Sequence, residues 1–191
     1  MRLFVAIEIP EAVRRALGEL IARLRTDSRG AKWVRPEAMH VTLKFIGEVE
    51  PAKVEAIRAA LRAVHSEQDV EMNFRGLGFF PNERRPRVLW CGIAASPNLA
   101  MLAADVDGAL KPLDIPAESR DFVPHLTLAR FSVDRGGPGA PDKLVRAADE
   151  LKSYDFGSTR ETEFHLIHSQ LKPSGAEYTR LESFPIVKSK N

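Results

Sequence analysis

The sequence predicts an α+β fold with antiparallel sheets, in two related halves. Strand-like and helix-like segments are interleaved along the 191 residues. Several consecutive strands occur near residue 80 and again close to the C-terminus, which favours antiparallel pairing over a doubly wound parallel sheet. A short motif also returns about half a chain length later, which indicates an internal duplication. A chain of this length fits one globular domain, or two small lobes that share a core.

The first half of the chain combines strands with helices that open on a proline. Apolar alternation predicts a strand at 2–9. Pro10 and Glu11 then begin a segment with apolar side chains at helical spacing, which predicts an amphipathic helix over 10–27. The next expected elements are a short strand at 32–35, a strand at 40–49 and a second proline-opened helix at 51–66.

The second half repeats this mixture and ends in a hairpin. Two strands are expected at 69–80 and 87–93, around the polar loop 81–86. The remaining expected elements are a helix at 96–110, a strand at 125–131, a Gly/Pro-rich loop at 136–141, a helix at 142–153 and a hairpin at 162–186 with its turn at 172–175.

Composition sets broad limits on the class of protein. Hydrophobic residues make up 44% and charged residues 28%, which is enough for a packed core, and the net charge of +2 neither demands nor excludes a nucleic-acid partner. One cysteine excludes an intramolecular disulfide framework and suits a reducing compartment. We see no signal-peptide pattern and no run near the roughly 20 apolar residues of a membrane span, so we expect a cytoplasmic protein that does not enter a membrane.

A repeated H-x-T-L motif is the most specific chemical signal. HVTL at 40–43 returns as HLTL at 125–128. Two chance copies of this pattern are expected only on the order of once in ten thousand chains of this composition. In a strand, residues i and i+2 share a face, so His40 projects with Thr42 and His125 with Thr127.

Two such pairs facing one cleft would suit phosphodiester chemistry. One imidazole could activate the nucleophile and the other could protonate the leaving oxygen, while the hydroxyls hold the non-bridging phosphate oxygens. Two alternatives stay open: ordinary hydrogen bonding of these side chains within a core, and a zinc site. No third ligand recurs at a matching spacing, which disfavours a metal.

Other chemically active residue types are better explained as structural. His165 and His168 lie three apart in a predicted strand and should face opposite sides. Cys91 lies in an apolar run and is expected to be a buried thiol. Trp33 and Trp90 are expected in the core.

The paired motifs resemble the HxTx signature of the two-histidine phosphoesterase superfamily. The flanking runs RLFVAIEIP, KWVRPEAMHVTLKFIGEV, RPRVLWCGI, PHLTLARF and SQLKPSGAEYTRLESF are similar to its RNA 2',3'-cyclic phosphodiesterases, also called 2'-5' RNA ligases. The likeness covers nearly the whole chain. It implies a single two-lobed domain over residues 1–191, with two pseudo-symmetric lobes, each an antiparallel sheet with flanking helices, around a central cleft.

The resemblance also implies the reaction and the roles of four residues. It implies hydrolysis of an RNA 2',3'-cyclic phosphate to a 2'-phosphate without metal, ATP or other cofactor, and 2'-5' joining of tRNA halves as a second activity. By motif position, His40 is the proton donor to the departing 3' oxygen and His125 is the proton acceptor. Thr42 and Thr127 hold the phosphate. The implied partners are RNA ends, nucleoside 2',3'-cyclic phosphates and tRNA, with no obligate protein partner.

The substrate-binding residues are less directly indicated. Arg130 and Phe45 are candidates for a phosphate contact and for base stacking, but strict alternation places each opposite its motif histidine unless the strand is bulged. Arg84, Arg85 and Arg87 form a basic cluster that could follow RNA phosphates or simply be a solvated loop. Two other functions stay open: a phosphodiesterase for another cyclic phosphate, such as ADP-ribose 1'',2''-cyclic phosphate, and a non-catalytic RNA-end binder.

Overall fold

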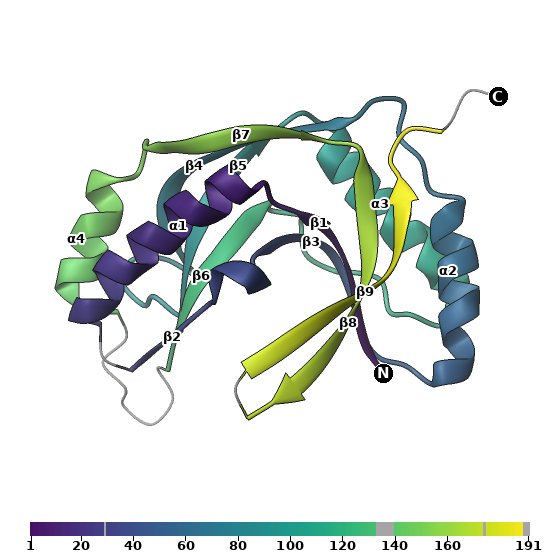
Figure 1. Cartoon of the computed structure of the whole chain (residues 1–191), viewed down its shortest axis with the longest axis horizontal. Helices are drawn as coiled ribbons and strands as arrows, with labels where there is room; N and C mark the ends of the chain where they lie inside the picture. Colours follow the sequence, from purple (N-terminus) through teal and green to yellow (C-terminus); the bar gives the residue numbers. More distant parts are fainter. Residues whose placement is uncertain (29, 133–139, 174, 189–191) are drawn as a thin grey trace.

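The structure, a computed structural model, describes residues 1–28, 30–132, 140–173 and 175–188 and contains two antiparallel sheets with flanking helices (Figure 1). The strands are β1 (Arg2–Glu8), β2 (Ala31–Trp33), β3 (His40–Glu48), β4 (Val70–Phe80), β5 (Val88–Ala95), β6 (His125–Phe131), β7 (Asp155–Glu161), β8 (Glu163–Lys172) and β9 (Gly175–Pro185). The helices are α1 (Glu11–Leu24), α2 (Val54–Arg62), α3 (Asn98–Leu110) and α4 (Asp142–Glu150), with 3-10 turns η1 (Arg25–Asp27), η2 (Pro36–Ala38), η3 (Pro51–Lys53) and η4 (Lys111–Leu113). The predicted α+β class is confirmed.

The two sheets are each flanked by their own pair of helices. Sheet A has the strand order β3-β1-β8-β9, and sheet B has the order β2-β6-β5-β4-β7. Helix α2 contacts β9 of sheet A, and α3 contacts β3 of sheet A and also β4 of sheet B, whereas α1 and α4 contact β7 and β4 of sheet B. Figure 1 shows this division, with α1 and α4 on the left and α2 and α3 on the right.

A pseudo-twofold relation between the two halves is visible in the pairing of β4 with β7. In this antiparallel ladder Asn73 lies opposite Ser158. These residues are 85 positions apart in the sequence, as are His40 and His125. A residue that pairs with its counterpart in the other half marks the position of a twofold axis. The internal duplication inferred from the motifs therefore extends to the backbone.

The two halves interlock because each contributes strands to both sheets. Strand β4, from the first half, pairs with β5 in sheet B, and β8, from the second half, pairs with β1 in sheet A. Buried side chains from both sheets and all four helices form one large hydrophobic cluster.

Strand β1 is almost continuously apolar because side chains on both of its faces are buried. Leu3, Val5 and Ile7 belong to the large cluster, whereas Phe4 and Ala6 form a small second cluster with Ile167 on the other face. A central strand buried on both faces has no need of polar alternation. The second face is the one on which the first motif lies.

Most predicted elements are confirmed, but one strand is missing from the prediction and three helices end early. Strand β7 is absent from the prediction because DFGSTRE has no apolar run; it pairs with β4 at the edge of sheet B, and its alternate residues are exposed. Gly157 within it has φ +122°, which also weakens a strand signature. Helix α1 ends at Leu24, α2 at Arg62 and α4 at Glu150, and α2 also starts only after the 3-10 turn at Pro51–Lys53. The predicted loop 136–141 lies largely outside the described residues, as does Ser174 of the predicted turn 172–175.

Candidate active site

The two motif histidines occupy equivalent places at the start of β3 and β6. Nδ1 of His40 lies 2.8 Å from the carbonyl oxygen of Ala38, and Nδ1 of His125 lies 2.7 Å from that of Val123. A carbonyl oxygen only accepts, so Nδ1 carries the hydrogen and donates in both rings. In the neutral rings Nε2 is then the nitrogen with the free lone pair. In both cases the carbonyl oxygen of the residue two positions earlier fixes the tautomer of the histidine.

Both motif strands contain the same β-bulge. Val5 pairs with Lys44 and Ala6 with Thr42, so Leu43 is an extra residue in β3. In β6, Leu89 pairs with Ala129 and Trp90 with Thr127, so Leu128 is the extra residue. The burial pattern is accordingly the same in both strands, with buried residues at the fourth and fifth positions and an exposed residue at the sixth.

The bulges bring the two uncertain candidates onto the motif faces. Phe45 pairs with Phe4, two residues from the partner of Thr42, and therefore shares the face of Thr42 and His40. Arg130 pairs with Val88, two residues from the partner of Thr127, and shares the face of Thr127 and His125. Phe45 is 61% exposed, and Arg130 is exposed too. Strict alternation would have placed Phe45 and Arg130 on the face opposite their motif histidines unless the strands were bulged. Each strand contains such a bulge.

A short connection ties the two motif strands together. The backbone N–H of Val34 donates to the carbonyl oxygen of Leu128 at 2.9 Å, which fastens the end of β2 to β6. The chain then forms η2 and enters sheet A at His40, six residues after Val34. Strands β3 and β6 also contact each other. The duplication thus places the two motifs on neighbouring strands of different sheets.

The His40 ring lies in an aromatic environment that sequence analysis did not identify. It stacks on Phe4 with ring centroids 4.6 Å apart and meets the edge of Tyr178 at 5.2 Å. Burial lowers the pKa of His40 from 6.5 to about 4, and the hydrogen bond to Ala38 offsets only part of that effect. His40 is therefore neutral at pH 7. Tyr178 comes from β9, 138 residues away, so no local pattern could have indicated it.

The His125 ring has a different aromatic neighbour. It meets the ring of Phe80 edge-on at 4.9 Å, and Phe80 in turn contacts Trp90 at 5.3 Å. Trp90 covers Gly78, where an added Cβ would overlap the indole ring. The expectation that Trp90 is a core residue is wrong, because it pairs with Thr127 on the motif face. Trp33, by contrast, is partly buried against the core.

The bulge in β3 turns Lys44 inward. Its ammonium donates to Asp107 of α3 and to the carbonyl oxygen of Pro116, both at 2.6 Å. Asp107 also accepts the backbone N–H of Glu118 at 3.0 Å. Burial alone would raise the pKa of Asp107, but hydrogen bonds from Lys44 and the Glu118 backbone lower it overall. Lys44 thereby joins the first motif strand to the segment that leads into His125.

Two histidines outside the motifs, His165 and His168, and the cysteine Cys91 match their predicted structural roles. His165 is buried and its Nδ1 lies 3.0 Å from the hydroxyl of Ser183, while His168 lies on the opposite face of β8. Cys91 is fully buried, and burial raises the pKa of its thiol to about 12. That thiol stays protonated near neutral pH.

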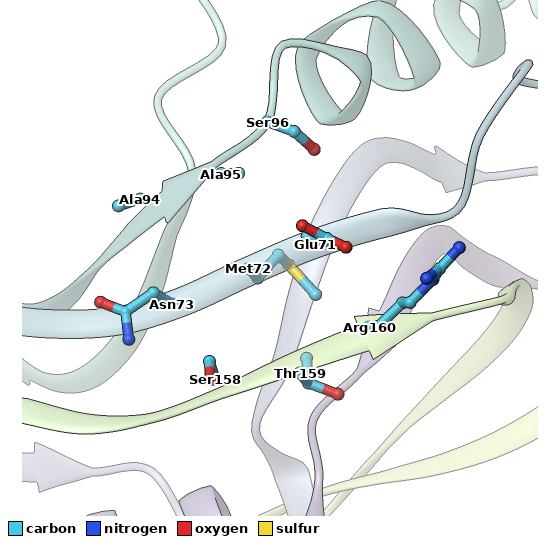
Figure 2. Close-up of a pocket in the computed structure, with 9 residues that line it drawn as sticks. All are labelled: Glu71, Met72, Asn73, Ala94, Ala95, Ser96, Ser158, Thr159 and Arg160. Carbon is cyan, nitrogen blue, oxygen red and sulfur yellow. The ribbon is translucent and has the colours of Figure 1, made fainter.

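Two surface hollows of the described chain lie away from both motif histidines. One, of about 620 Å³, lies where β4, β5 and β7 meet, and Figure 2 shows the residues that line it. Another, of about 460 Å³, lies between the ends of β1, β3 and β8. Among the described residues no group of three or more His, Cys, Asp or Glu side chains is placed to hold a metal ion. In the same ranges no helix is both long and apolar enough to cross a membrane.

Comparisons with known proteins place the chain in a family. The model of the LigT like Phosphoesterase family matches residues 7–90 and 93–178, and each segment contains one H-x-T-L motif. The chain belongs to this family. An RNA 2',3'-cyclic phosphodiesterase of Archaeoglobus fulgidus is 37% identical over 184 residues, which cover 96% of this chain and 99% of the relative. One of Methanothermobacter thermautotrophicus is 34% identical over 185 residues, covering 96% and 98%.

Solved structures support the fold. The crystal structure of TT0787 of Thermus thermophilus has a TM-score of 0.79 and 34% identity, covering 97% of this chain and 98% of that one. Escherichia coli LigT, crystallised with 3'-AMP, has a TM-score of 0.76 and 24% identity, covering 98% of both chains. The α+β fold of two antiparallel sheets with flanking helices, as the family resemblance implies, is thereby confirmed.

Proposed function

We propose that the chain hydrolyses RNA 2',3'-cyclic phosphate ends to 2'-phosphates by acid/base catalysis with His40 and His125. The observation that carries this proposal is the matching construction of the two motifs. In each, a backbone carbonyl fixes Nδ1–H, so that Nε2 is free to exchange a proton, and a threonine shares the face of the histidine. Relatives named RNA 2',3'-cyclic phosphodiesterase over nearly the full length support the choice of substrate.

The proposed step needs two proton transfers. Water attacks phosphorus and gives its proton to Nε2 of His125, while the bond from phosphorus to the 3' oxygen breaks and that oxygen takes a proton from Nε2 of His40. Thr42 and Thr127 donate hydroxyl hydrogen bonds to the non-bridging oxygens, on which negative charge grows. The product is a 2'-phosphate, and exchange with solvent restores both histidines.

His40 must gain a proton before it can act as the donor. Its low pKa keeps it neutral in the free protein, and an anionic phosphate beside it favours the charged imidazolium. Substrate binding and protonation of His40 are therefore coupled in this proposal.

The same chemistry accommodates ligation of tRNA halves. If a 5'-hydroxyl takes the place of water, the same displacement of the 3' oxygen gives a 2'-5' diester without ATP. Water and the hydroxyl then compete for one position beside His125.

The direct test is product analysis with a ribonucleoside 2',3'-cyclic phosphate. We expect a 2'-phosphate as the product, a bell-shaped dependence of rate on pH, and no loss of rate with a chelator. Phosphorus NMR distinguishes the 2'- from the 3'-phosphate. Binding without turnover would instead support a non-catalytic RNA-end binder. Preferential turnover of ADP-ribose 1'',2''-cyclic phosphate would identify that molecule, rather than an RNA end, as the substrate.

Phe45 and Arg130 are proposed to bind the substrate, by base stacking and by a phosphate contact. Phe45→Ala should raise KM for a cyclic nucleotide about 10-fold with little change in kcat, since base stacking on an aromatic ring is worth roughly 1–3 kcal/mol. Arg130→Gln should raise KM for an oligoribonucleotide end, whose backbone phosphates it would contact. Steady-state kinetics measure both, with Phe45→Trp expected to retain binding. Met101→Ala on α3, an equally exposed apolar side chain, is the control. An unchanged KM in Phe45→Ala would exclude the stacking role.

A further inference from the structure

A cluster of exposed cations lies at one end of sheet B, beyond the second motif. It consists of Lys32, Arg84, Arg85, Arg87 and Arg130, and we call it the cation cluster. Lys32 and Val88 both pair with Arg130, on either side of β6. The N–H of Phe131 donates to the carbonyl oxygen of Arg87 at 2.8 Å, so the loop that carries Arg84 and Arg85 lies beside the end of β6.

The cation cluster has no counter-charge in the part of the chain that the structure describes. None of its five side chains makes an ion pair there, whereas other exposed arginines do: Arg62 with Glu182, Arg160 with Asp69 and Arg180 with Glu8. The loop itself contains a single carboxylate, Glu83. Five adjacent cations without partners repel one another, and an anion bound among them would relieve that repulsion.

The loop is held in a defined shape. The side-chain oxygen of Asn82 accepts the backbone N–H of Arg84 at 3.0 Å and that of Arg85 at 3.1 Å. This turn fixes the backbone positions of two neighbouring arginines. A fixed turn loses less conformational freedom on binding than a flexible loop would.

The spacing along β6 matches a nucleic-acid strand. His125 and Arg130 lie on the same face, opposite Gly92 and Val88 of β5, which are four residues apart, and at about 3.3 Å per residue this is roughly 13 Å. At the ~3.4 Å spacing of stacked nucleotides this is about four nucleotides. A strand whose terminal phosphate lies at His125 and which follows β6 would reach the cation cluster after that length.

We propose that the cation cluster binds the backbone of the RNA strand several nucleotides 5' of the cyclic phosphate. The inference rests on the proposed function for the location of the RNA end. It makes the enzyme selective for oligoribonucleotide ends over mononucleotides, because a mononucleotide fills the catalytic site without reaching the cation cluster.

The test compares two charge-matched double variants on substrates of different length. Arg84→Ser/Arg85→Ser removes two cations of the cluster, and Lys53→Ser/Lys111→Ser removes two exposed lysines at the ends of α2 and α3. With an RNA decamer that ends in a 2',3'-cyclic phosphate, the arginine variant should show a KM about 10-fold higher at low salt. With uridine 2',3'-cyclic phosphate the KM of the arginine variant should match that of the wild type. The KM of the lysine variant should match that of the wild type on both substrates.

Binding measured without turnover separates the two proposals. Fluorescence anisotropy with a 3'-hydroxyl RNA decamer should show that the slope of log affinity against log salt falls by about 1.4 in the arginine variant, at ~0.7 per lost phosphate contact. If no cyclic phosphate is hydrolysed but this slope changes, the proposed function fails and the RNA surface stands. If all variants hydrolyse the mononucleotide and bind the decamer equally, the surface is overturned and the proposed function stands.

Discussion

His40→Ala and His125→Ala should each lower turnover of a ribonucleoside 2',3'-cyclic phosphate by at least about 100-fold. Positioned general acids and bases contribute roughly 10²–10⁴-fold, and each variant removes one of the two proton carriers. Because the two act in the same step, the double variant should lose much less than the product of the single losses. Single-turnover rates at saturating substrate are the appropriate measurement, since they exclude product release.

A matched histidine outside the motifs provides the control. His168→Ala removes a half-buried imidazole from β8 that pairs with Leu3, on the core-side face of sheet A. Its turnover should stay within about twofold of the wild type. Wild-type turnover in either motif variant would contradict the acid/base assignment, whereas loss in all three variants would indicate a general effect on folding.

The low pKa of His40 gives an independent check that its variant is folded. An unfolded histidine titrates near 6.5 and the folded one near 4, so the unfolded state binds the proton first as the pH falls. The wild type should therefore lose stability between pH 6.5 and 4, by up to about 3 kcal/mol, and His40→Ala should lose less over the same interval. Urea unfolding at several pH values measures this difference. Equal losses in both proteins would show that His40 is not the buried neutral group described above.

The fold and the centre of the site could be predicted from the sequence because their signals are local. The H-x-T-L repeat and the proline-opened helices are short patterns that need no knowledge of tertiary contacts. The bulges are different, because an extra residue in β3 or β6 is visible only against the register of β1 or β5. A strictly alternating strand would point Phe45 and Arg130 away from the motif histidines, and the bulge reverses that direction.

The remaining site residues depend on contacts between distant segments. Tyr178 reaches His40 from β9, and Phe80 reaches His125 from β4. Lys44 reads in the sequence as a polar residue of a half-exposed strand, whereas the bulge in β3 turns it toward α3, where it is buried. Strand β7 is recognisable by its pairing with β4 rather than by its polar sequence.

Asp107→Ala should destabilise the protein by about 3 kcal/mol, the largest effect on stability that we expect of a single substitution away from the motifs. It leaves the ammonium of Lys44 buried, with a side chain only 5% exposed and no counter-charge. Removing one partner of a buried ion pair typically costs about 3–5 kcal/mol, and the 17% exposure of Asp107 favours the lower end. Equilibrium unfolding in urea measures the change. Asp149→Ala, which removes an exposed ion pair with Lys152, should change stability by less than about 1 kcal/mol.

A double variant distinguishes the stability of this ion pair from its effect on the site. Lys44→Met/Asp107→Leu replaces both charges by apolar side chains, which should restore most of the stability because no buried charge is left unpaired. It does not restore the hydrogen bonds to Pro116 and Glu118, which hold the segment leading to His125. Stability near that of the wild type with a lowered kcat would therefore show that Lys44 and Asp107 position the second motif. Full recovery of both would show that the ion pair serves packing alone.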